Sequence, residues 1–190
     1  MYFYIEAEIP LSPQVRAAAL ISAFKSVRDI PYYIAVANEP DFCCCTKADM
    51  LLQRFKELGV KARPVLTRFR WEDLGLPAEI LRLPHVELEH HRHVEVYIPA
   101  VRRFVQVDPT WDAPLKHVLP VAEWDGRSDT RIAVPVISRY PVEEGEAEYK
   151  RIFAEEELRL YLEQMRDFLT AFNNFLAAAR RSNCTQLDPP

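Results

Sequence analysis

The sequence predicts an α+β fold in which helices pack on an antiparallel sheet, and two stretches carry this prediction. After Cys44 the apolar residues recur at steps of three and four, the spacing of a helix with one buried face. Residues 94–98 and 104–107 alternate apolar and polar side chains around a turn, which is typical of a β-hairpin. A long helical pattern near the C-terminus completes the expected architecture.

The length and charge of the chain indicate how many domains it forms and which kinds of partner it is expected to lack. The 190 residues suit one domain, and the net charge of −4 comes from interspersed acidic and basic residues. Such a pattern does not indicate a nucleic-acid partner. No apolar run approaches the ~18 residues of a membrane span, and the N-terminus lacks the pattern of a signal peptide. We therefore expect a cytoplasmic protein with no nucleic-acid or membrane partner.

The N-terminal elements follow from local signals. Residues 2–9 are short, aromatic and β-branched, which predicts a strand. Residues 12–28 predict a helix, because a serine can cap it and a proline suits its first turn. The second helix is expected from about Cys44 to Gly59, since glycine commonly ends a helix at that position.

Three further segments lie between the second helix and the C-terminal one. Residues 60–69 predict a strand, and residues 71–83 an irregular or helical stretch. Residues 132–137 predict another strand, which Pro135 would confine to the edge of the sheet.

Residues 146–181 form one long helical pattern with a single apolar face. A straight helix of that length would span ~50 Å, whereas a compact domain of this size is about 40 Å across. The helix is therefore expected either to break or to project and meet a partner, such as a second copy of the chain. We expect one domain, with a core at residues 1–145 and a helical extension at residues 146–182.

The four cysteines are Cys43, Cys44, Cys45 and Cys184. Neighbouring cysteines rarely bridge each other, so a disulfide framework is not expected. The three consecutive cysteines lie where loop becomes helix. A helix N-terminus stabilises a nucleophilic thiolate, and its N–H groups can bind an oxyanion. The alternative is that these residues are small buried hydrophobic side chains.

The hairpin supplies the second chemical group. Packing the valines of residues 94–96 against those of 105–107 fixes the register, because a slip by one residue would expose one valine face. That register places His91 and Asp108 near each other on the opposite, polar face. A carboxylate beside a histidine orients the ring and stabilises its protonated form. The pair is thus the second half of a Cys-His-Asp site.

Three segments share the order and spacing of a known family. Residues 44–48, followed by a leucine-rich helix that ends at residues 58–63, form the first. Residues 91–97 read His-Arg-His-Val-Glu-Val-Tyr, and residues 107–112 read Val-Asp-Pro-Thr-Trp-Asp. Together they resemble the cysteine helix, the histidine strand and the Asp-Thr segment of the transglutaminase-like superfamily. The resemblance covers roughly residues 28–112.

The resemblance implies a papain-like, cysteine-protease-like core whose nucleophile helix packs on an antiparallel sheet. It implies Cys44 as nucleophile, His91 as general base and acid, and Asp108 as the residue that orients His91. The implied activity is that of a thiol-dependent amide or peptide hydrolase, or an acyltransferase, working through an acyl-enzyme. Its substrate would be a peptide, a protein or a small amide, and no cofactor or metal is required.

The substrate pocket is expected to include Tyr32, Tyr33, His93 and Trp111. The two tyrosines are also candidates for the second oxyanion donor. His93 stands where the family usually has an aromatic residue, so it is expected to form a pocket wall. One departure is Phe42, which occupies the position two before the cysteine where the family commonly has glycine. The approach of the substrate backbone is therefore expected to differ.

Two other readings compete with the triad. Residues 85–93 are rich in histidine and glutamate, and the three cysteines could join them, since zinc takes both Cys and His. However, no Cys-x-x-Cys pair exists and consecutive cysteines are expected to point in different directions, so no metal site is predicted. A binding module without catalysis is the other alternative. The complete Cys-His-Asp set argues against it.

Overall fold

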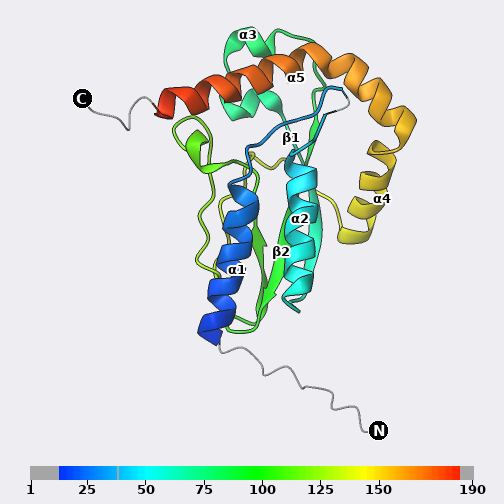
Figure 1. Cartoon of the computed structure of the whole chain (residues 1–190). Coiled ribbons are helices and arrows are strands. Elements are labelled where there is room, and N and C mark those ends of the chain that lie inside the picture. Colours follow the sequence, from blue (N-terminus) through cyan, green and yellow to red (C-terminus); the bar gives the residue numbers. More distant parts are fainter. Residues whose placement is uncertain (1–12, 38, 185–190) are drawn as a thin grey trace, which may run out of the picture.

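The computed structural model describes residues 13–37 and 39–184, so the strand expected at residues 2–9 lies outside the described residues. The described chain forms helices packed around an antiparallel sheet, as the sequence predicts (Figure 1). In chain order the elements are α1 (Pro13–Arg28), α2 (Cys44–Glu57), β1 (Ala62–Phe69), the 3-10 helix η1 (Trp71–Leu74), α3 (Ala78–Leu81), β2 (Glu89–Ile98), β3 (Arg103–Val107), the 3-10 helix η2 (Ala113–Leu115), β4 (Ser138–Arg139), α4 (Val142–Ile152) and α5 (Glu155–Cys184).

The sheet has the strand order β3-β2-β1-β4, and each neighbouring pair is antiparallel. The predicted hairpin register is confirmed, because Val94 pairs with Val107 and Val96 pairs with Val105. β2 begins at Glu89, earlier than the alternating run indicated. Its first residues lie beyond the hairpin and pair instead with β1.

Helices α1 and α2 pack on the valine face of the hairpin, and both lie in front of the sheet in Figure 1. The apolar steps of each helix place its large side chains on one stripe, which is the face that must leave water. The buried residues of this helix-facing core are Leu20, Phe24, Val27, Ala48, Leu51, Phe55, Val94, Val96, Ile98, Val105, Val107, Ala122 and Trp124.

The backbone conformation at each end of α2 defines where the helix begins and ends. Cys43 is the N-cap, with an extended backbone at φ −71° and ψ 178°, and Cys44 is the first helical residue. At the other end Gly59 has φ +64°, and the N–H groups of Gly59 and Val60 bond to carbonyls of the last turn. This closure needs a left-handed residue, which is why glycine ends the helix as predicted.

The long C-terminal pattern breaks, which was one of its two expected outcomes: α4 ends at Ile152 and α5 begins at Glu155. α5 has 30 residues and runs across the top of the molecule in Figure 1. No helix in the described part of the chain is both long and apolar enough to cross a membrane. The buried face of α5 forms a second core, the α5 core, from Met165, Phe168, Leu169, Phe172, Leu176 and Ala179 with Trp71, Leu76, Trp111 and Leu115.

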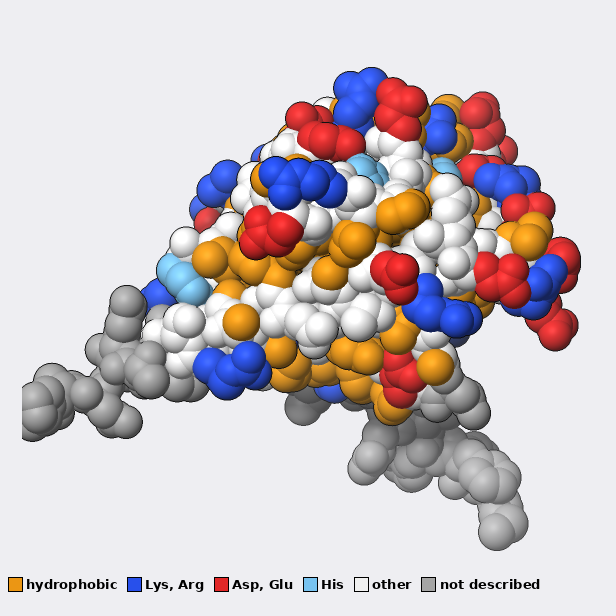
Figure 2. Space-filling model, turned by 90° about the horizontal axis from the view of Figure 1, so that it is seen from above, with side chains coloured by type: hydrophobic (Ala, Val, Ile, Leu, Met, Phe, Trp, Pro, Cys, Tyr) orange, Lys and Arg blue, Asp and Glu red, His pale blue; other side chains and the backbone are white. Residues whose placement is uncertain are grey.

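The opposite side of α5 is charged. Arg159 pairs with Glu156 and Glu163 one turn away on either side. Figure 2 views the molecule from the side on which α5 lies and shows acidic and basic side chains around a band of hydrophobic ones. The two signs are interspersed there, as the sequence indicates.

The strand expected at residues 132–137 is wrong. Only the next two residues pair with β1, as β4. The N–H of Thr130 bonds to the edge of β3, and the N–H of Ile137 bonds to the edge of β1. The segment between them therefore crosses the sheet from one edge to the other. Its apolar side chains, such as Ala133 and Val134, are buried because they cover that face and not because they pair as a strand.

Candidate functional site

His91 and Asp108 form a buried pair. Nε2 of His91 lies 2.8 Å from Oδ2 of Asp108, and each residue is 1% exposed. The hairpin register positions both residues, since His91 lies on β2 and Asp108 directly follows the last residue of β3. The proximity that the valine pattern predicted is therefore present.

The carboxylate of Asp108 is held by four hydrogen bonds. Oδ1 accepts from the N–H and the hydroxyl of Thr110, at 3.1 and 2.5 Å. Oδ2 accepts from the N–H of Ala133 at 2.7 Å, in addition to His91. Burial alone would raise the pKa of Asp108, but the charge of His91 and these bonds lower it. Asp108 is thus an ionised, immobile acceptor.

The pKa values of His91 and Cys44 are shifted in opposite directions. Burial lowers the pKa of His91, but Asp108 and then Cys44 outweigh it and raise that pKa to about 10. Hydrogen bonding with the Cys43 and Cys45 thiols lowers the pKa of Cys44, and His91 lowers it further, against the effect of burial. The arrangement therefore favours a thiolate on Cys44 and an imidazolium on His91.

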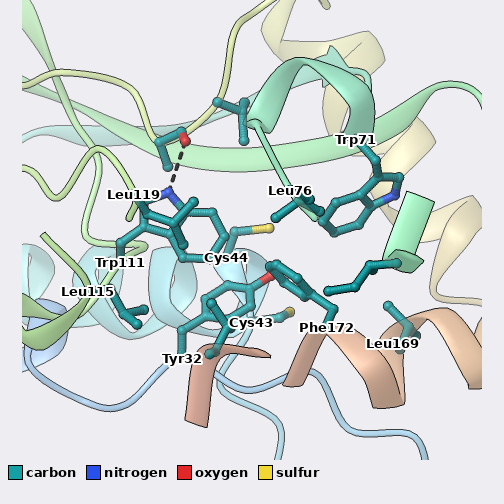
Figure 3. Close-up of a cluster of buried hydrophobic side chains, with 14 of the residues drawn as sticks. Tyr32, Cys43, Cys44, Trp71, Leu76, Trp111, Leu115, Leu119, Leu169 and Phe172 are labelled. Atoms are coloured by element: carbon teal, nitrogen blue, oxygen red, sulfur yellow. Dashed lines mark hydrogen bonds between the residues drawn. The ribbon is translucent and has the colours of Figure 1, made fainter. Parts of the chain in front are cut away.

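The three thiols differ in their pKa values, but their sulfur atoms lie close together. The pKa of Cys43 is raised chiefly by its hydrogen bond to Cys44, and that of Cys45 chiefly by its bonds to Cys43 and Cys44. The expectation that consecutive cysteines point apart is wrong, because all three sulfurs lie within 4.8 Å of one another. Cys43 is the extended N-cap and does not follow the 100° step of the helix, while the sulfurs of the helical Cys44 and Cys45 lie 4.0 Å apart. Figure 3 shows the Cys43 and Cys44 sulfurs directed into one space.

A cavity of about 560 Å³ opens beside these sulfurs. Cys44 and His91 both line it, so a bound molecule could contact the two groups together. Its walls come from the N-terminal end of α2, the adjoining ends of β1 and β2, and the junction of α4 and α5. They are rich in aromatic rings, namely Tyr32, Phe69, Trp71, Trp111, Phe153 and Tyr161.

The expected pocket residues divide into two groups. Tyr32 and Trp111 line the cavity, with ring centroids 4.5 Å apart. Tyr33 and His93 are not among the described residues that line it. The hydroxyl of Tyr33 bonds instead to Glu39 at 3.0 Å. The side chain of Tyr33 is therefore engaged in the loop that precedes α2.

His93 lies behind His91 and not in the pocket wall. Their rings stack at 5.7 Å between centroids, and His93 is 1% exposed. Neither ring nitrogen of His93 has a hydrogen-bond partner within the described part of the chain. Burial lowers its pKa to about 4, so His93 is neutral at ordinary pH. The expectation for this residue failed because strand alternation does not reveal the segment that crosses over this face.

Glu89 is a cavity residue that the sequence reasoning missed. It lines the cavity with Cys44 and accepts a hydrogen bond from the hydroxyl of Tyr161 at 2.8 Å. Burial raises its pKa to about 7. The extended β2 could have signalled this position, since Glu89 lies two residues before His91 and therefore on the same strand face.

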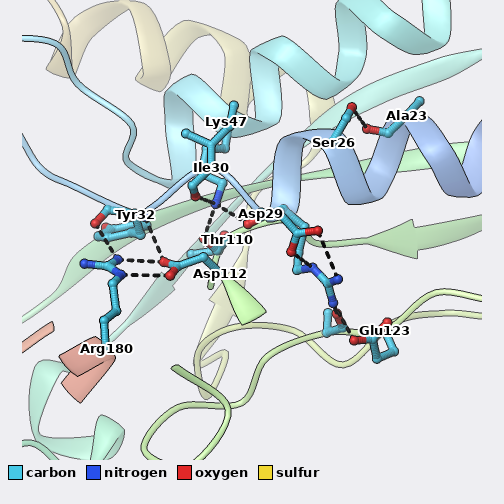
Figure 4. A network of polar contacts seen from close by, with 12 residues as sticks. Ala23, Ser26, Asp29, Ile30, Tyr32, Lys47, Thr110, Asp112, Glu123 and Arg180 are labelled. Carbon is cyan, nitrogen blue, oxygen red and sulfur yellow. Dashed lines mark hydrogen bonds and ion pairs between the residues drawn. The ribbon is translucent and has the colours of Figure 1, made fainter. Parts of the chain in front are cut away.

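Lys47 was also missed, and it fixes the helix of Cys44. Its ammonium donates to the backbone carbonyls of Arg28, Ile30 and Thr110, at 2.9, 2.8 and 2.8 Å (Figure 4). All three donors are therefore used, although burial lowers the pKa of Lys47 to about 7. These bonds join α2 to the segment that carries Asp108. The available signal was a lysine four residues before a core leucine of α2.

Asp112 and Arg180 attach α5 to the pocket. The guanidinium of Arg180 donates to both carboxylate oxygens of Asp112, at 2.8 and 2.6 Å. Tyr32 completes the network: its N–H donates to Asp112 at 2.9 Å, and its carbonyl accepts from Arg180 at 2.9 Å (Figure 4). The C-terminal helix thus holds the Tyr32 wall in place, a role that no local motif indicates.

Two groups of described residues could hold a metal ion: the three cysteines, and His91 with His93 and Asp108. In the second group the potential ligand atoms lie within 4.8 Å, but only His91 lines the cavity. Nε2 of His91 and Oδ2 of Asp108 are already hydrogen-bonded to each other. That geometry suits an ion pair better than two ligands at the ~2.0–2.2 Å of a metal bond.

Comparison of the chain with protein-family models, curated proteins and solved structures finds no match. The likeness to transglutaminase-like proteins therefore remains a resemblance of residues and spacing.

Proposed function

We propose that this protein is a thiol-dependent amide or peptide hydrolase built on a transglutaminase-like core. Cys44 is the nucleophile, His91 the general base and acid, and Asp108 the residue that orients His91. One observation carries the proposal: Cys44 and His91 share a cavity, while Asp108 binds Nε2 of the His91 ring. This is the arrangement that Cys-His-Asp chemistry requires.

The first step is attack of the Cys44 thiolate on the amide carbonyl. A carbon–sulfur bond forms, and the carbonyl electrons move to the oxygen. As the tetrahedral intermediate collapses, the carbon–nitrogen bond breaks and His91 gives its proton to the leaving amine. Water then attacks the thioester with His91 as base, which releases a carboxylic acid and restores the thiol. Asp108 keeps Nε2 of His91 engaged, so Nδ1 is the atom that exchanges the proton.

The N-terminus of α2 supports the same chemistry. The first N–H groups of a helix have no carbonyl partner four residues earlier, and they carry the positive end of the helix dipole. Cys44 is the first residue of α2, which supports its own N–H as the donor to the developing oxyanion. Tyr32 lines the same cavity, and its hydroxyl is the candidate for the second donor.

The cavity favours a small amide or a single apolar group over a long polypeptide. Its volume of about 560 Å³ falls in the range of pockets that bind small molecules. Its walls are largely aromatic, and Cys44 is only 9% exposed. An apolar acyl group near the thiol, with the leaving amine toward the opening, fits these walls.

Acyl transfer to an amine is the second candidate, and the burial of the thiol favours it. A pocket that excludes water protects the thioester from hydrolysis until another acceptor enters. Glu89 faces this pocket without a cationic partner among the described residues, so it could bind the incoming amine. The reaction would use the same acyl-enzyme and the same three residues.

The test is to trap the acyl-enzyme. Wild-type protein is mixed with an activated apolar ester, such as a p-nitrophenyl ester, and its intact mass is measured. We expect one acyl group on Cys44, released over time by water or faster by an added amine. Cys44→Ala should give no adduct and Cys184→Ala, the matched control, should behave as the wild type. Acylation of Cys44→Ala at the wild-type rate would reject the proposal.

A further inference from the structure

The three consecutive cysteines form a cluster, and the proposed function uses only one of them as a nucleophile. A hydrolase of this kind needs a single thiol. Here three sulfurs lie within 4.8 Å of one another, and those of Cys44 and Cys45 are 4.0 Å apart. All three residues line the cavity, so the cluster is open to a small ion from that side.

We propose that Cys43, Cys44 and Cys45 together bind one thiophilic d10 cation of the Zn²⁺ class. Thiolates are the ligands that such soft or borderline cations select. Three protein ligands leave one coordination position open, and the cavity provides room there for a water molecule or another small ligand.

The sulfur separations fit this coordination. Zinc–sulfur bonds of about 2.3 Å place two sulfurs of a tetrahedral site about 3.8 Å apart. The Cys44 and Cys45 sulfurs already lie at 4.0 Å, and no pair exceeds 4.8 Å. Each sulfur therefore has to move by less than about 1 Å, which small changes in side-chain torsion can supply.

The backbone explains how adjacent residues can converge. Cys44 and Cys45 are consecutive helical residues whose Cα–Cβ directions differ by ~100°, yet their sulfurs lie 4.0 Å apart. Cys43 precedes the helix with an extended backbone, so its side chain does not follow the helical step, and its sulfur lies within 4.8 Å of the other two. The cluster thus depends on the N-cap conformation of Cys43 and not on a Cys-x-x-Cys spacing.

The surrounding charges suit the complex. Three thiolates and one divalent cation carry a net charge of −1. The complex would lie at the N-terminus of α2, where a helix stabilises negative charge. His91 lines the same cavity and supplies further positive charge. Asp41 also lines the cavity, and its Oδ2 accepts hydrogen bonds from the N–H of Cys43 and the hydroxyl of Thr46.

The cation would also control the activity proposed above, and this part of the inference rests on that function. A metal-bound Cys44 sulfur cannot attack a carbonyl. The cation is therefore an inhibitor, and its removal by a chelator or by a competing thiol restores the nucleophile.

The binding test uses the reduced full-length chain and Cd²⁺ as a spectroscopic probe for zinc-like ions. We expect a sulfur-to-cadmium charge-transfer band that saturates at one equivalent, with one Cd²⁺ per chain by native mass spectrometry. Excess iodoacetamide is then added, and the tryptic peptide of residues 29–47, which holds all three thiols, is weighed. We expect it to stay unmodified with Cd²⁺ and to be alkylated with Mg²⁺, while Cys184 is alkylated in both samples.

Matched variants assign the ligands. Cys43→Ser and Cys45→Ser should each weaken Cd²⁺ binding at least tenfold, whereas Cys184→Ser should leave it unchanged. The wild-type protection pattern decides the matter even if a serine variant fails to fold. Absence of the band at excess Cd²⁺, protection of fewer than three thiols in that peptide, or equal protection by Mg²⁺ would overturn the site.

The two proposals can fail separately. If Cd²⁺ binds to the three thiols but acylation by the p-nitrophenyl ester continues unchanged, the metal site stands and Cys44 is not the nucleophile. If Cys44→Ala abolishes acylation but Cd²⁺ does not bind, the hydrolase stands and the metal site is wrong.

Discussion

Nε2 of His91 and Oδ2 of Asp108 are joined by a 2.8 Å hydrogen bond that is almost completely shielded from water. This bond comes from the register of one hairpin and from a carboxylate whose other acceptor sites are filled by Thr110 and Ala133. It decides which nitrogen of His91 faces Cys44. The proposed chemistry, the pH behaviour and much of the stability of the site depend on this pair.

Asp108→Asn is expected to destabilise the protein in a pH-dependent way. The pKa of His91 is raised from 6.5 to about 10, so the stability from this pair is complete below pH 6.5 and is lost as the pH rises through about 10. The pKa of Asp108 is lowered from 3.8, so its contribution is present above that pH and lost as the pH falls. At any pH between 4 and 6.5, the free energy of unfolding of Asp108→Asn should therefore be about 2–4 kcal/mol lower than that of the wild type.

Urea unfolding of wild type and Asp108→Asn at pH 6 and pH 10 measures this difference. The loss should be smaller at pH 10, where about half of His91 is already neutral in the folded wild type. An equal loss at the two pH values would mean that Asp108 acts by packing and hydrogen bonding alone, without a charged His91.

His93→Leu is expected to make the protein less sensitive to acid. The pKa of His93 is lowered to about 4 by burial, whereas the unfolded value is 6.5. As the pH falls from 6.5 to 4 the unfolded chain binds a proton that the folded protein does not, which costs stability. The full effect is up to ~3 kcal/mol, from 1.36 kcal/mol per pKa unit.

Unfolding free energies at pH 4.5, 5.5 and 6.5 should fall less steeply in His93→Leu than in the wild type. The variant should also be no less stable at pH 6.5, because it removes two buried nitrogens without partners. The same slope in both proteins would show that His93 is protonated or paired in the folded state.

Arg180→Ala is expected to loosen α5 and the pocket wall together. It removes the guanidinium from Asp112, which is 1% exposed, and from the carbonyl of Tyr32. A buried carboxylate left without its cation should cost about 2–4 kcal/mol. Thermal or urea unfolding measures the loss, and Arg159→Ala is the control, since its pairs lie on the exposed side of α5. If both variants had the same urea midpoint, Arg180 would not anchor the helix.

The sequence predicted those parts of the site whose structure is decided by short-range periodicity. The valines of residues 94–96 and 105–107 determine the hairpin register, because only one register buries both sets. His91 and Asp108 then come together as a consequence. The limits of α2 were also predictable, since glycine at position 59 favours a left-handed helix end.

The remaining features depend on contacts between distant segments. Residues 132–137 look like a strand because they are apolar, but they cross the sheet, and the N–H of Ala133 binds Asp108 there. Lys47 looks like a solvated helix residue until three carbonyls from separate segments surround it. The convergence of the three sulfurs depends on the backbone of Cys43 and on the side-chain torsions of all three residues, which no spacing rule reveals.

The central claim is that Cys44 alone among the three consecutive cysteines is ionised, because hydrogen bonds with the Cys43 and Cys45 thiols and then the charge of His91 lower its pKa. Limiting iodoacetamide at pH 6, followed by peptide mapping with fragmentation across residues 43–45, tests it most directly. An ordinary thiol titrates near pH 8.5, so it is almost unreactive at pH 6. The pKa of Cys44 is lowered well below the usual value for a thiol, so Cys44 should be labelled first. His91→Ala should weaken that preference, because His91 is one of the groups that lower this pKa.

The same alkylation followed from pH 5 to 9 should give a wild-type midpoint well below 8.5, and His91→Ala should move the midpoint upward. Preferential labelling of Cys43, Cys45 or Cys184, or an unchanged profile in His91→Ala, would contradict the account.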